Sequence, residues 1–393
     1  MSNDSIVIVN GARTAMGSFQ GALSGATAPQ LGATAIKAAV ERSNVAIDDI
    51  DEVIMGCILT AGLGQGPARQ AMRQAGLSDA IGAVTINKLC GSGLKAVMQA
   101  HDAIKAGSAD VIVAGGMESM TNAPYILPQS RAGYRMGHKE VKDHMFLDGL
   151  EDAETGKLMG QFAQEVADEK GYTREQMDDF AIESLNRAKT AIEEGHFTDE
   201  IVPMTIKTRK GEVTVEVDEE PGNANIDRIP KLRPAFAKEG TITAANASSI
   251  SDGAAAVVVT RQSLAEEKGL TPQARIVATA TFSRHPSEFT LAPIGSIERV
   301  LDKAGWTVED VDLWEINEAF AMVTMLAIDE LNIPHEKVNV EGGACALGHP
   351  VGCSGARILV TLINSLKRTG GKKGVASLCI GGGEAVAVAI ELI

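Results

Sequence analysis

Short runs of apolar residues alternate along the chain with stretches in which apolar residues recur at helical spacing. The run 84–86 predicts a strand, and a helix should follow it, with Gly107 as its stop signal. The side chains expected to share one face of that helix are Leu94, Val97, Ala100, His101 and Ile104. A further strand is predicted at 5–9, and a long amphipathic helix from Thr173 to Glu194. Strands that alternate with helices predict an α/β fold, in which helices cover buried sheets.

The pattern occurs twice in the chain. Residues 36–57 align without a gap with residues 297–318, and both segments have the pattern of a helix, a turn and a strand. A second match places residues 91–93 opposite residues 353–355 at nearly the same offset. Because two blocks at one offset are unlikely to match by chance, we interpret the chain as two copies of one α/β unit. Residues at equivalent corners of the two copies would then converge on a cleft.

The repeat divides the chain into three parts. Residues 1–120 are predicted to form an N-terminal half that residues 248–270 complete, and residues 271–393 a C-terminal half. The segment 121–247 breaks the pattern and is rich in charge, glycine, proline and methionine. We interpret it as an inserted loop domain. After it, residues 247–260 are expected to form a helix and then a strand.

Composition narrows the possible functions. The 393 residues, of which 45% are hydrophobic, suffice for a sizeable core. The net charge of −15 argues against nucleic acid as a partner, because phosphates need clustered lysine and arginine. No apolar run approaches the ~20 residues of a membrane span. The first strand begins too early for a signal or transit peptide, and residues 391–393 are not a peroxisomal signal, so we expect a cytoplasmic protein.

Five cysteines are present, an odd number for a set of disulfides. They are Cys57, Cys90, Cys345, Cys353 and Cys379. No two are separated by two residues, which argues against a zinc site or a dithiol redox motif. Cys57 is expected to be a small buried residue without a chemical role.

Cys90 lies in "NKLCGSGLKAV", between the predicted strand and the predicted helix. A cysteine that precedes a helix faces unpaired N–H groups and the positive end of the helix dipole, which favour the thiolate. The glycines that follow would permit a tight turn and leave room for a substrate, and Ser92 is a candidate N-cap. This pattern fits an activated nucleophile and, equally, a small residue selected for tight packing.

Three further motifs bring polar groups to the ends of predicted elements in the second copy. His349 lies in the glycine-rich "GGACALGHPVGCSGAR", at the corner equivalent to that of Cys90. Asn317 begins "NEAF" at the end of a strand, and Cys379 begins "CIGGG", where backbone N–H groups are free of side-chain crowding. A histidine in this position is more consistent with catalysis than with a structural role.

Six motifs together resemble the thiolase family, of the acetyl-CoA acetyltransferase type, over essentially the whole chain. They are "NKLCGSGLKAV", "GGMESM", "ANASSISDGAAA", "NEAFA", "GGACALGHPVGCSGAR" and "CIGGGEA", in the order of the family. The resemblance implies a five-layered αβαβα core of two similar halves, with a loop domain over the active site. It also implies reversible condensation of two acetyl-CoA to acetoacetyl-CoA and CoA, with no metal or redox cofactor.

The resemblance also assigns roles to individual residues. Cys90 would carry the acyl group, His349 would accept the Cys90 proton, and Cys379 would act as acid and base at the α-carbon. Asn317, through a water, and His349 would stabilise the enolate oxygen. The backbone N–H groups of Cys90 and Gly381 would form the oxyanion hole.

Contacts to coenzyme A are also implied by the resemblance. Ser248 would hydrogen-bond the pantetheine arm, with Leu150, Met159, Phe236, Ala244, Ala319 and Phe320 lining it. The chain departs from many short-chain members at Leu158, Pro221 and Phe289, and Arg228 could replace a missing arginine near the adenine. Basic residues of the loop domain could attract the phosphates: Lys207, Arg209, Lys210, Arg228, Lys231, Arg233 and Lys238.

Alternatives remain open at this point. A thiolase of β-oxidation with a broad range of chain lengths would use the same residues. A decarboxylating synthase of the same fold is disfavoured by the second cysteine and by the "GHP" histidine, and a non-catalytic acyl-CoA carrier by the presence of Cys90, His349 and Cys379. The resemblance further suggests a homotetramer built as a dimer of dimers. The two phenylalanines Phe289 and Phe320 predict a preference for four-carbon substrates.

Overall fold

A computed structural model describes residues 4–209 and 211–393. The first copy of the repeat forms a sheet in the order β4-β3-β5-β10-β1. Its strands are β1 (Ile6–Arg13), β3 (Glu52–Gly56), β4 (Gly82–Ile86), β5 (Val111–Ser119) and β10 (Ser251–Arg261). β3 is parallel to β4 and β5, and β10 is antiparallel to β5 and β1.

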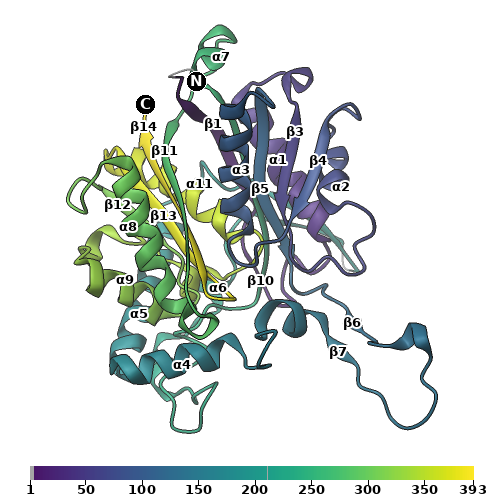
Figure 1. Ribbon diagram of the computed structural model, residues 1–393, viewed down its shortest axis with the longest axis vertical. Coiled ribbons are helices and arrows are strands. Elements are labelled where there is room, and N and C mark those ends of the chain that lie inside the picture. The colour runs from purple at the N-terminus through teal and green to yellow at the C-terminus, as the bar shows by residue number, and fades with distance from the viewer. Residues whose placement is uncertain (1–3, 210) are drawn as a thin grey trace.

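The second copy has the same strand order, β12-β13-β14-β11. Its strands are β11 (Ala274–Ser283), β12 (Leu313–Ile316), β13 (Lys373–Ile380) and β14 (Glu384–Leu392). A parallel bridge between Trp314 and Val338 occupies the place that β4 has in the first copy. β1 and β11 pair through two residue pairs, which joins the two sheets side by side (Figure 1). The duplication predicted from the repeat is therefore present in the strand order.

Helices form three layers around the two sheets. α3 (Ser92–Ala106) and α11 (Ser354–Thr369) contact each other and strands of both copies, so they form the central layer. α1 (Ala28–Ser43) and α2 (Pro67–Gln74) cover the outer face of the first sheet, and α8 (Ala292–Ala304) with α9 (Ala321–Leu331) that of the second. This arrangement is the predicted αβαβα fold.

The two central helices approach each other through the glycines that the repeat aligns. A Cβ atom on Gly93 would lie 2.8 Å from the backbone nitrogen of Ala356, and one on Gly355 would lie 2.4 Å from that of Leu94. Both distances are shorter than real Cβ contacts, so only glycine permits this crossing. The crossing brings the N-termini of α3 and α11 together, and with them the turns that carry Cys90 and His349.

Two predicted helices have their expected ends. α3 ends at Gly107, whose φ of 79° is in the left-handed region that glycine adopts without strain. α5 (Arg174–Glu193) has Thr173 as its N-cap, and Thr173 and Gln176 form a capping box.

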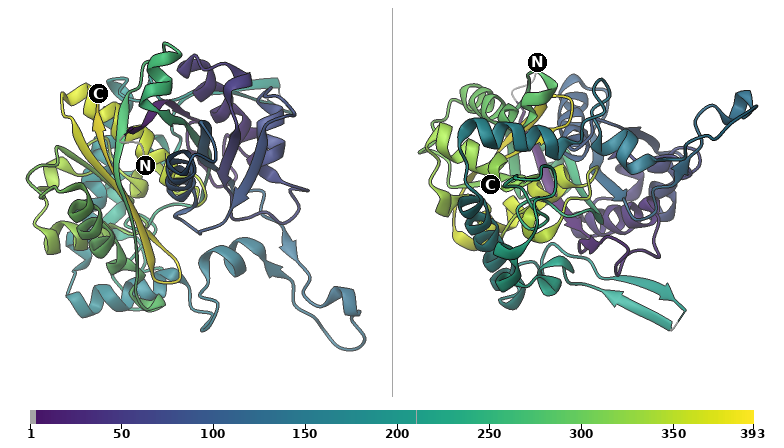
Figure 2. Two further views of the ribbon diagram at one scale, coloured as in Figure 1. Left: turned by 45° about the horizontal axis from the view of Figure 1, so that its top comes forward. Right: turned by 90° about the horizontal axis from the view of Figure 1, so that it is seen from below.

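The middle of the chain is more structured than predicted. A second helix, α4 (Met159–Lys170), precedes α5, although the sequence pattern predicted only one in this region. Two short hairpins project from the body, β6 (Tyr125–Ile126) with β7 (Lys142–Asp143), and β8 (Met204–Thr208) with β9 (Gly211–Val215) (Figure 2). The remaining elements are β2 (Gly17–Ser18), α6 (Glu220–Asn223), α7 (Gln262–Glu267), α10 (Ala344–Leu347), the π-helical turn Phe146–Leu150 and 3₁₀ turns at Ile47–Asp49, Ser130–Ala132, Ile226–Lys231, Pro286–Leu291 and His335–Lys337.

The helix expected at the start of 247–260 is absent. Residues 247–250 are not helical, and β10 begins at Ser251. The carbonyl of Ser249 accepts the backbone N–H of His349 at 3.1 Å, and the hydroxyl of Ser251 donates to the same carbonyl at 3.0 Å. Contacts with a distant turn therefore override the helical pattern of this segment.

A buried ion-pair network attaches the middle region to the first sheet. Arg13 on β1 is fully buried and donates to Glu200 at 2.5 Å and to both carboxylate oxygens of Asp218 at 2.7 and 2.9 Å. The hydroxyl of Thr361 also donates to Glu200, at 3.0 Å. Removal of one partner would leave a buried charge uncompensated, which is strongly destabilising. The network therefore holds the middle region in a fixed position against the first sheet.

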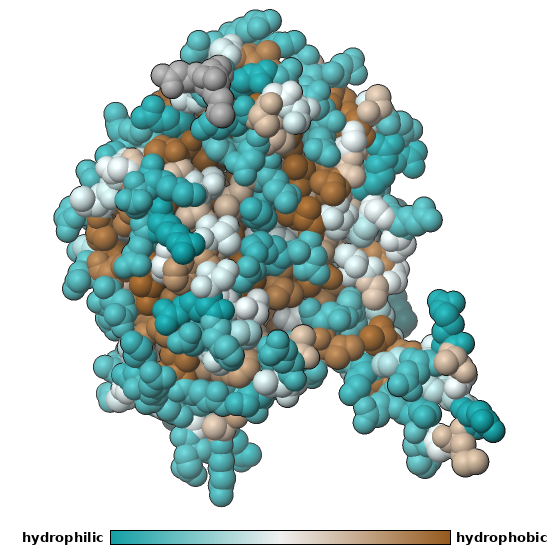
Figure 3. All heavy atoms as spheres, viewed as in Figure 1, coloured by the Kyte–Doolittle hydropathy of each residue, from teal (hydrophilic) through white to brown (hydrophobic). Residues whose placement is uncertain are grey.

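The surface in Figure 3 is mostly polar, with apolar groups where the β6–β7 segment leaves the body. This segment also exposes large apolar side chains: Tyr125, Leu127, Tyr134, Met136 and Val141. None of the helices in the described part of the chain is long and apolar enough to cross a membrane.

Candidate active site

Residues from both halves meet where α3 begins. Cys90 precedes α3, and the backbone N–H of Gly381, in the turn between β13 and β14, faces its sulfur. Cys379 lies near the end of β13, and its thiol is close enough to Cys90 for Cys90 to raise its pKa. His349 precedes α11 by five residues, and Val351 of the same turn packs in one apolar cluster with Cys90. The structure thus brings Cys90, Cys379 and Gly381 together, and it places the turn of His349 beside Cys90.

The turn at Cys90 is tight and depends on its neighbours. Leu89 has a φ of 47°, and α3 begins at Ser92 with Gly91 as its N-cap. The prediction that Ser92 is the N-cap is therefore wrong. Its hydroxyl instead accepts the N–H of Lys88 at 2.8 Å and donates to the carbonyl of Leu89 at 2.7 Å. These two bonds close the turn that presents Cys90.

The thiol of Cys90 does not have the lowered pKa that its place before a helix predicts. Burial raises the pKa of Cys90, and the charge of Glu118 raises it further, although the N–H groups of Gly381 and Cys90 oppose both effects. The free-energy cost of removing the thiolate from water is larger than the stabilisation that the helix N-terminus gives it. Cys90 is therefore a thiol in the free protein, and it would need a base in order to act as a nucleophile.

His349 presents the free ring nitrogen that such a base would need. Its Nδ1 lies 2.5 Å from the hydroxyl of Ser354, which itself donates to the carbonyl of Pro350 at 3.0 Å. Since that hydroxyl has one proton, Nδ1 carries the imidazole proton and Nε2 is a free acceptor. Nε2 is buried without a hydrogen-bond partner among the described residues. Burial, with a smaller effect from Arg357, lowers the pKa of His349 to about 3, so the ring is neutral at pH 7.

Cys379 and Asn317 complete the set. Burial raises the pKa of Cys379 well above its ordinary value, and the nearby Cys90 adds to this effect. Asn317 follows β12 directly and is 1% exposed, yet neither its side-chain oxygen nor its nitrogen has a partner in the described part of the chain. A buried amide with both polar groups unpaired is costly, so this side chain is suited to a water or a substrate oxygen.

Two buried carboxylates that the sequence analysis left without a role support the site. Glu118 accepts the backbone N–H groups of Ile58, Leu59 and Gly352 at 3.0 to 3.1 Å. It thereby connects the first half to the turn of His349, and the thiol of Cys57, buried as predicted, also faces it. Burial raises the pKa of Glu118 to about 7. The signal for Glu118 in the sequence was the motif "GGMESM", which contains it. The N–H groups that its carboxylate accepts belong to residues that are distant in the sequence.

The second carboxylate, Glu318, is part of the motif that supplies Asn317. It accepts the hydroxyl of Ser184 at 2.8 Å, the amide of Asn339 at 2.8 Å and the N–H of Cys345 at 3.0 Å. These bonds attach the end of β12 to α5 and to the turn that leads to His349.

We expect Glu118→Gln to destabilise the fold and slow catalysis. An amide nitrogen in place of one carboxylate oxygen would face an N–H donor instead of accepting it, at a cost of ~1–3 kcal/mol of unfolding free energy. The turn of His349 would lose part of its support. Thermal unfolding and kcat measure both effects, and Glu298→Gln, on the exposed face of α8, is the matched control. Wild-type stability and kcat in Glu118→Gln would contradict this role.

The predicted lining residues fall into two apolar groups. Phe236, Phe289 and Phe320 pack edge to face, with ring centroids 6.0 and 6.3 Å apart, in the cluster that contains Cys379. Ala319 and Met159 belong to the same cluster, and Leu158 precedes α4. Leu150 packs instead in the cluster of Cys90. The hydroxyl of Ser248 donates to the carbonyl of Ala319 at 3.0 Å.

The residues predicted to contact the rest of coenzyme A lie on several different segments and do not form one cluster. Ala244 and Arg228 are exposed, and Arg228 lies on the 3₁₀ turn Ile226–Lys231, which packs on α5. Pro221 is buried on α6. The other basic residues that were expected to attract the phosphates are also exposed where the structure describes them: Lys207, Arg209, Lys231, Arg233 and Lys238. Lys210 lies outside the described residues.

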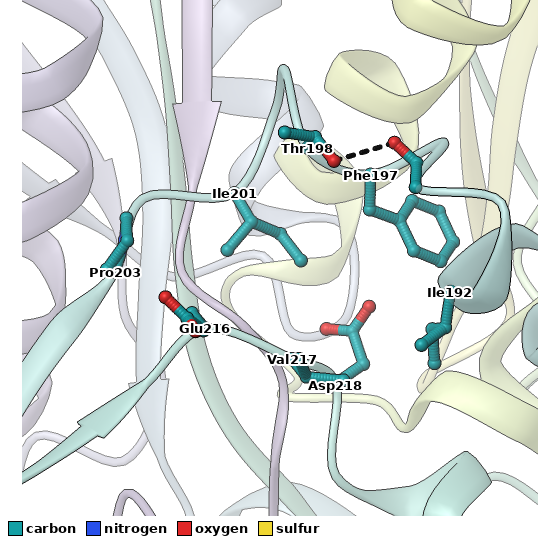
Figure 4. A pocket seen from close by; sticks show the side chains of 9 residues that line it. Ile192, Phe197, Thr198, Ile201, Pro203, Glu216, Val217 and Asp218 are labelled. Carbon is teal, nitrogen blue, oxygen red and sulfur yellow. Dashed lines mark hydrogen bonds between the residues drawn. The ribbon is translucent and has the colours of Figure 1, made fainter.

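The pocket of ≈ 270 Å³ in Figure 4 is a separate feature. It lies in the middle region, and Asp218, which binds Arg13, is at its wall. Its other lining residues are Ile192, Gly195, Phe197, Thr198, Ile201, Pro203, Glu216 and Val217. None of the predicted site residues lines it, so we do not assign it to the reaction. In the described part of the chain, no group of three or more His, Cys, Asp or Glu could hold a metal ion.

Known proteins resemble the chain over nearly its whole length. Family models described as "Thiolase, N-terminal domain" and "Thiolase, C-terminal domain" match residues 6–263 and 270–392. The acetyl-CoA acetyltransferase of Cupriavidus necator is 52% identical over 388 residues, which cover 98% of this chain and 99% of that protein. That of Escherichia coli is 49% identical over 387 residues, 98% of each chain.

A solved structure shows the same fold. The crystal structure of the Bacillus anthracis acetyl-CoA acetyltransferase superposes with a TM-score of 0.97 at 42% sequence identity, and 99% of each chain is covered. The duplicated strand order, the meeting of Cys90, Cys379 and Gly381 and both family models lead to one conclusion: this chain belongs to the thiolase family.

Proposed function

We propose that this protein is an acetyl-CoA C-acetyltransferase, which condenses two acetyl-CoA to acetoacetyl-CoA and CoA and catalyses the reverse thiolysis. The observation that carries the proposal is the position of the Cys90 sulfur against the N–H of Gly381, next to a second thiol, Cys379. The names of the similar proteins support the substrate. Coenzyme A thioesters are substrates in this reaction.

The first half-reaction transfers an acetyl group to Cys90. Nε2 of His349 accepts the thiol proton, and the sulfur attacks the thioester carbonyl of acetyl-CoA. The N–H groups of Cys90 and Gly381 stabilise the negative oxygen of the tetrahedral intermediate. The carbon–sulfur bond to CoA breaks, and the CoA thiolate takes the proton from His349. One thioester replaces another, so the step costs little free energy.

The second half-reaction forms the carbon–carbon bond. Cys379 passes its thiol proton to Nε2 of His349, and the resulting thiolate removes a proton from the methyl group of a second acetyl-CoA. The side chains of His349 and, through a water, Asn317 stabilise the enolate oxygen. The enolate carbon attacks the acetyl carbonyl on Cys90, and the bond to the Cys90 sulfur breaks. Acetoacetyl-CoA leaves, the proton held by Cys379 restores the Cys90 thiol, and His349 returns its proton to Cys379.

Thiolysis tests the proposal directly. Purified protein mixed with acetoacetyl-CoA and CoA should produce two acetyl-CoA for each acetoacetyl-CoA consumed. Initial rates should show ping-pong kinetics, because acetylated Cys90 separates the two half-reactions. Absence of acetyl-CoA formation by folded protein would refute the proposed function.

A β-oxidation thiolase with a broad range of chain lengths is the second candidate, and Phe289 bears on it. Its ring, 2% exposed, is packed against Phe320 in the cluster of Cys379, where a longer alkyl chain would need volume. We therefore propose a preference for four-carbon substrates. One methylene in a pocket is worth only ~1–3 kcal/mol, so moderate activity on six carbons is compatible with this preference.

We predict that Phe289→Ala shifts the chain-length profile toward longer substrates. Removal of the ring should raise kcat/KM for 3-ketohexanoyl-CoA relative to acetoacetyl-CoA by roughly 10-fold. The matched control is Phe282→Ala, because Phe282 lies on β11 and packs against Gly295 and Arg299 outside the cluster of Cys379. An unchanged profile in Phe289→Ala would show that another residue limits the pocket, and wild-type preference for longer chains would favour the β-oxidation role.

The surroundings of the site support three further proposals. We propose that residues 121–247 form the loop domain, between residues 1–120 with 248–270 and residues 271–393, and that it covers the active site and binds coenzyme A. We propose a homotetramer, which the exposed apolar side chains of the β6–β7 segment support. A cytoplasmic location is proposed from the sequence.

A further inference from the structure

An ion pair connects the turn of Cys90 to the hairpin of the second half. Nζ of Lys88 lies 2.5 Å from a carboxylate oxygen of Glu384, and their side chains are only 20% and 34% exposed. The other oxygen of Glu384 accepts the hydroxyl of Ser283 at 3.3 Å. The pair joins residues from different copies of the repeat, which are 296 positions apart in the chain.

Both ends of the pair are close to reacting groups. Lys88 is two residues before Cys90, and its backbone closes the turn through its N–H to Ser92 and its carbonyl to Gly91. Glu384 is the first residue of β14 and pairs with Ile380 across the hairpin whose turn contains Gly381. The hairpin therefore carries both Cys379 and the second oxyanion donor.

A steric contact lies beside the ion pair. A Cβ atom on Gly91 would be 2.3 Å from the Cδ1 atom of Ile380, so the turn and the hairpin already touch there. Apolar contacts have no preferred direction, so they allow the two segments to slide or rotate against each other. The Lys88–Glu384 pair adds a directional attachment between the turn and the hairpin. Together with the apolar contact, it fixes the orientation of one segment relative to the other.

We propose that Lys88 and Glu384 are positioning residues, which hold the Cys90 turn against the hairpin so that the Cys90 sulfur faces the Gly381 N–H. This inference rests on the proposed acetyltransferase reaction. Neither side chain touches the substrate in this role. The oxyanion donors come from different halves of the molecule, and a misplacement of ~1 Å can cost on the order of 10²-fold in rate.

A double-mutant cycle with charge reversal tests the pair. The variants are Lys88→Met, Glu384→Gln, the double variant Lys88→Met/Glu384→Gln and the reversal Lys88→Glu/Glu384→Lys. For each, kcat and KM are measured in thiolysis of acetoacetyl-CoA, together with the rate of Cys90 acetylation by acetyl-CoA. Thermal unfolding verifies the fold of each variant.

We expect each single variant to lower kcat and the acetylation rate by roughly 10-fold, with KM within about 2-fold of wild type, since the lost function is alignment. The double variant should be no slower than the singles, and the reversal should recover activity to within about 3-fold of wild type. A structural role alone would lower the unfolding temperature without this split between kcat and KM.

The control is the pair Lys268 and Asp49, whose side chains are 40% and 28% exposed and which joins α7 to the turn Ile47–Asp49 away from Cys90. Lys268→Met should leave kcat unchanged. Wild-type rates in the single variants, additive losses in the double variant or failure of the reversal to recover activity would each overturn the proposal. These results require an active wild-type protein, so an inactive wild type refutes the proposed function instead.

Discussion

Cys90→Ala should abolish thiolysis and condensation, with a loss of roughly 10³-fold or more, because the variant lacks the sulfur that is proposed to carry the acyl group. Incubation of the wild-type protein with acetyl-CoA should add one acetyl group, which mass spectrometry maps to the peptide that contains Cys90. The variant should remain unlabelled. Since Cys90 packs in an apolar cluster and replacement by alanine removes only one atom, the fold should persist.

The matched control is Cys353→Ala, which removes a buried thiol at the N-cap of α11. This control variant should still be acetylated on Cys90. Acetylation at full extent in Cys90→Ala would contradict the assignment of the nucleophile.

Cys379→Ser should separate the two half-reactions. We expect acetyl exchange between acetyl-CoA and pantetheine to continue, because this exchange needs only Cys90, His349 and the oxyanion donors. Condensation and thiolysis should fall by roughly 10²–10⁴-fold, because a hydroxyl is a far weaker acid and base at the α-carbon than a thiol. Parallel assays of exchange and thiolysis on one preparation give the ratio of the two effects.

The burial of Cys379 makes the result of Cys379→Ser easier to interpret. The side chain is 1% exposed, so serine fits the same space and the fold is retained. Equal losses in exchange and thiolysis by a correctly folded variant would show that Cys379 also serves the first half-reaction. Thermal unfolding of the same preparation establishes whether the variant is folded.

Much of the architecture follows from the sequence by itself. The gapless match of 36–57 with 297–318 predicted two similar halves, and the strand orders confirm it. α5 and the end of α3 were readable because an N-cap threonine and a left-handed glycine act locally. The motifs of Cys90, His349, Asn317 and Cys379 pointed to the residues of the candidate site, because each follows or precedes an element whose pattern is clear. Their individual roles remain predictions.

Other features depend on contacts between residues that are distant in the sequence. The donors around Glu118, the ion pair of Lys88 with Glu384 and the loss of the helix expected at 247–250 all depend on the packing of one half against the other. The thiol of Cys90 is the clearest case. The helix N-terminus beside Cys90 predicts a lowered pKa for its thiol, whereas burial raises that pKa. Desolvation is set by every atom that surrounds the sulfur, so only the tertiary structure decides the protonation state of the candidate nucleophile.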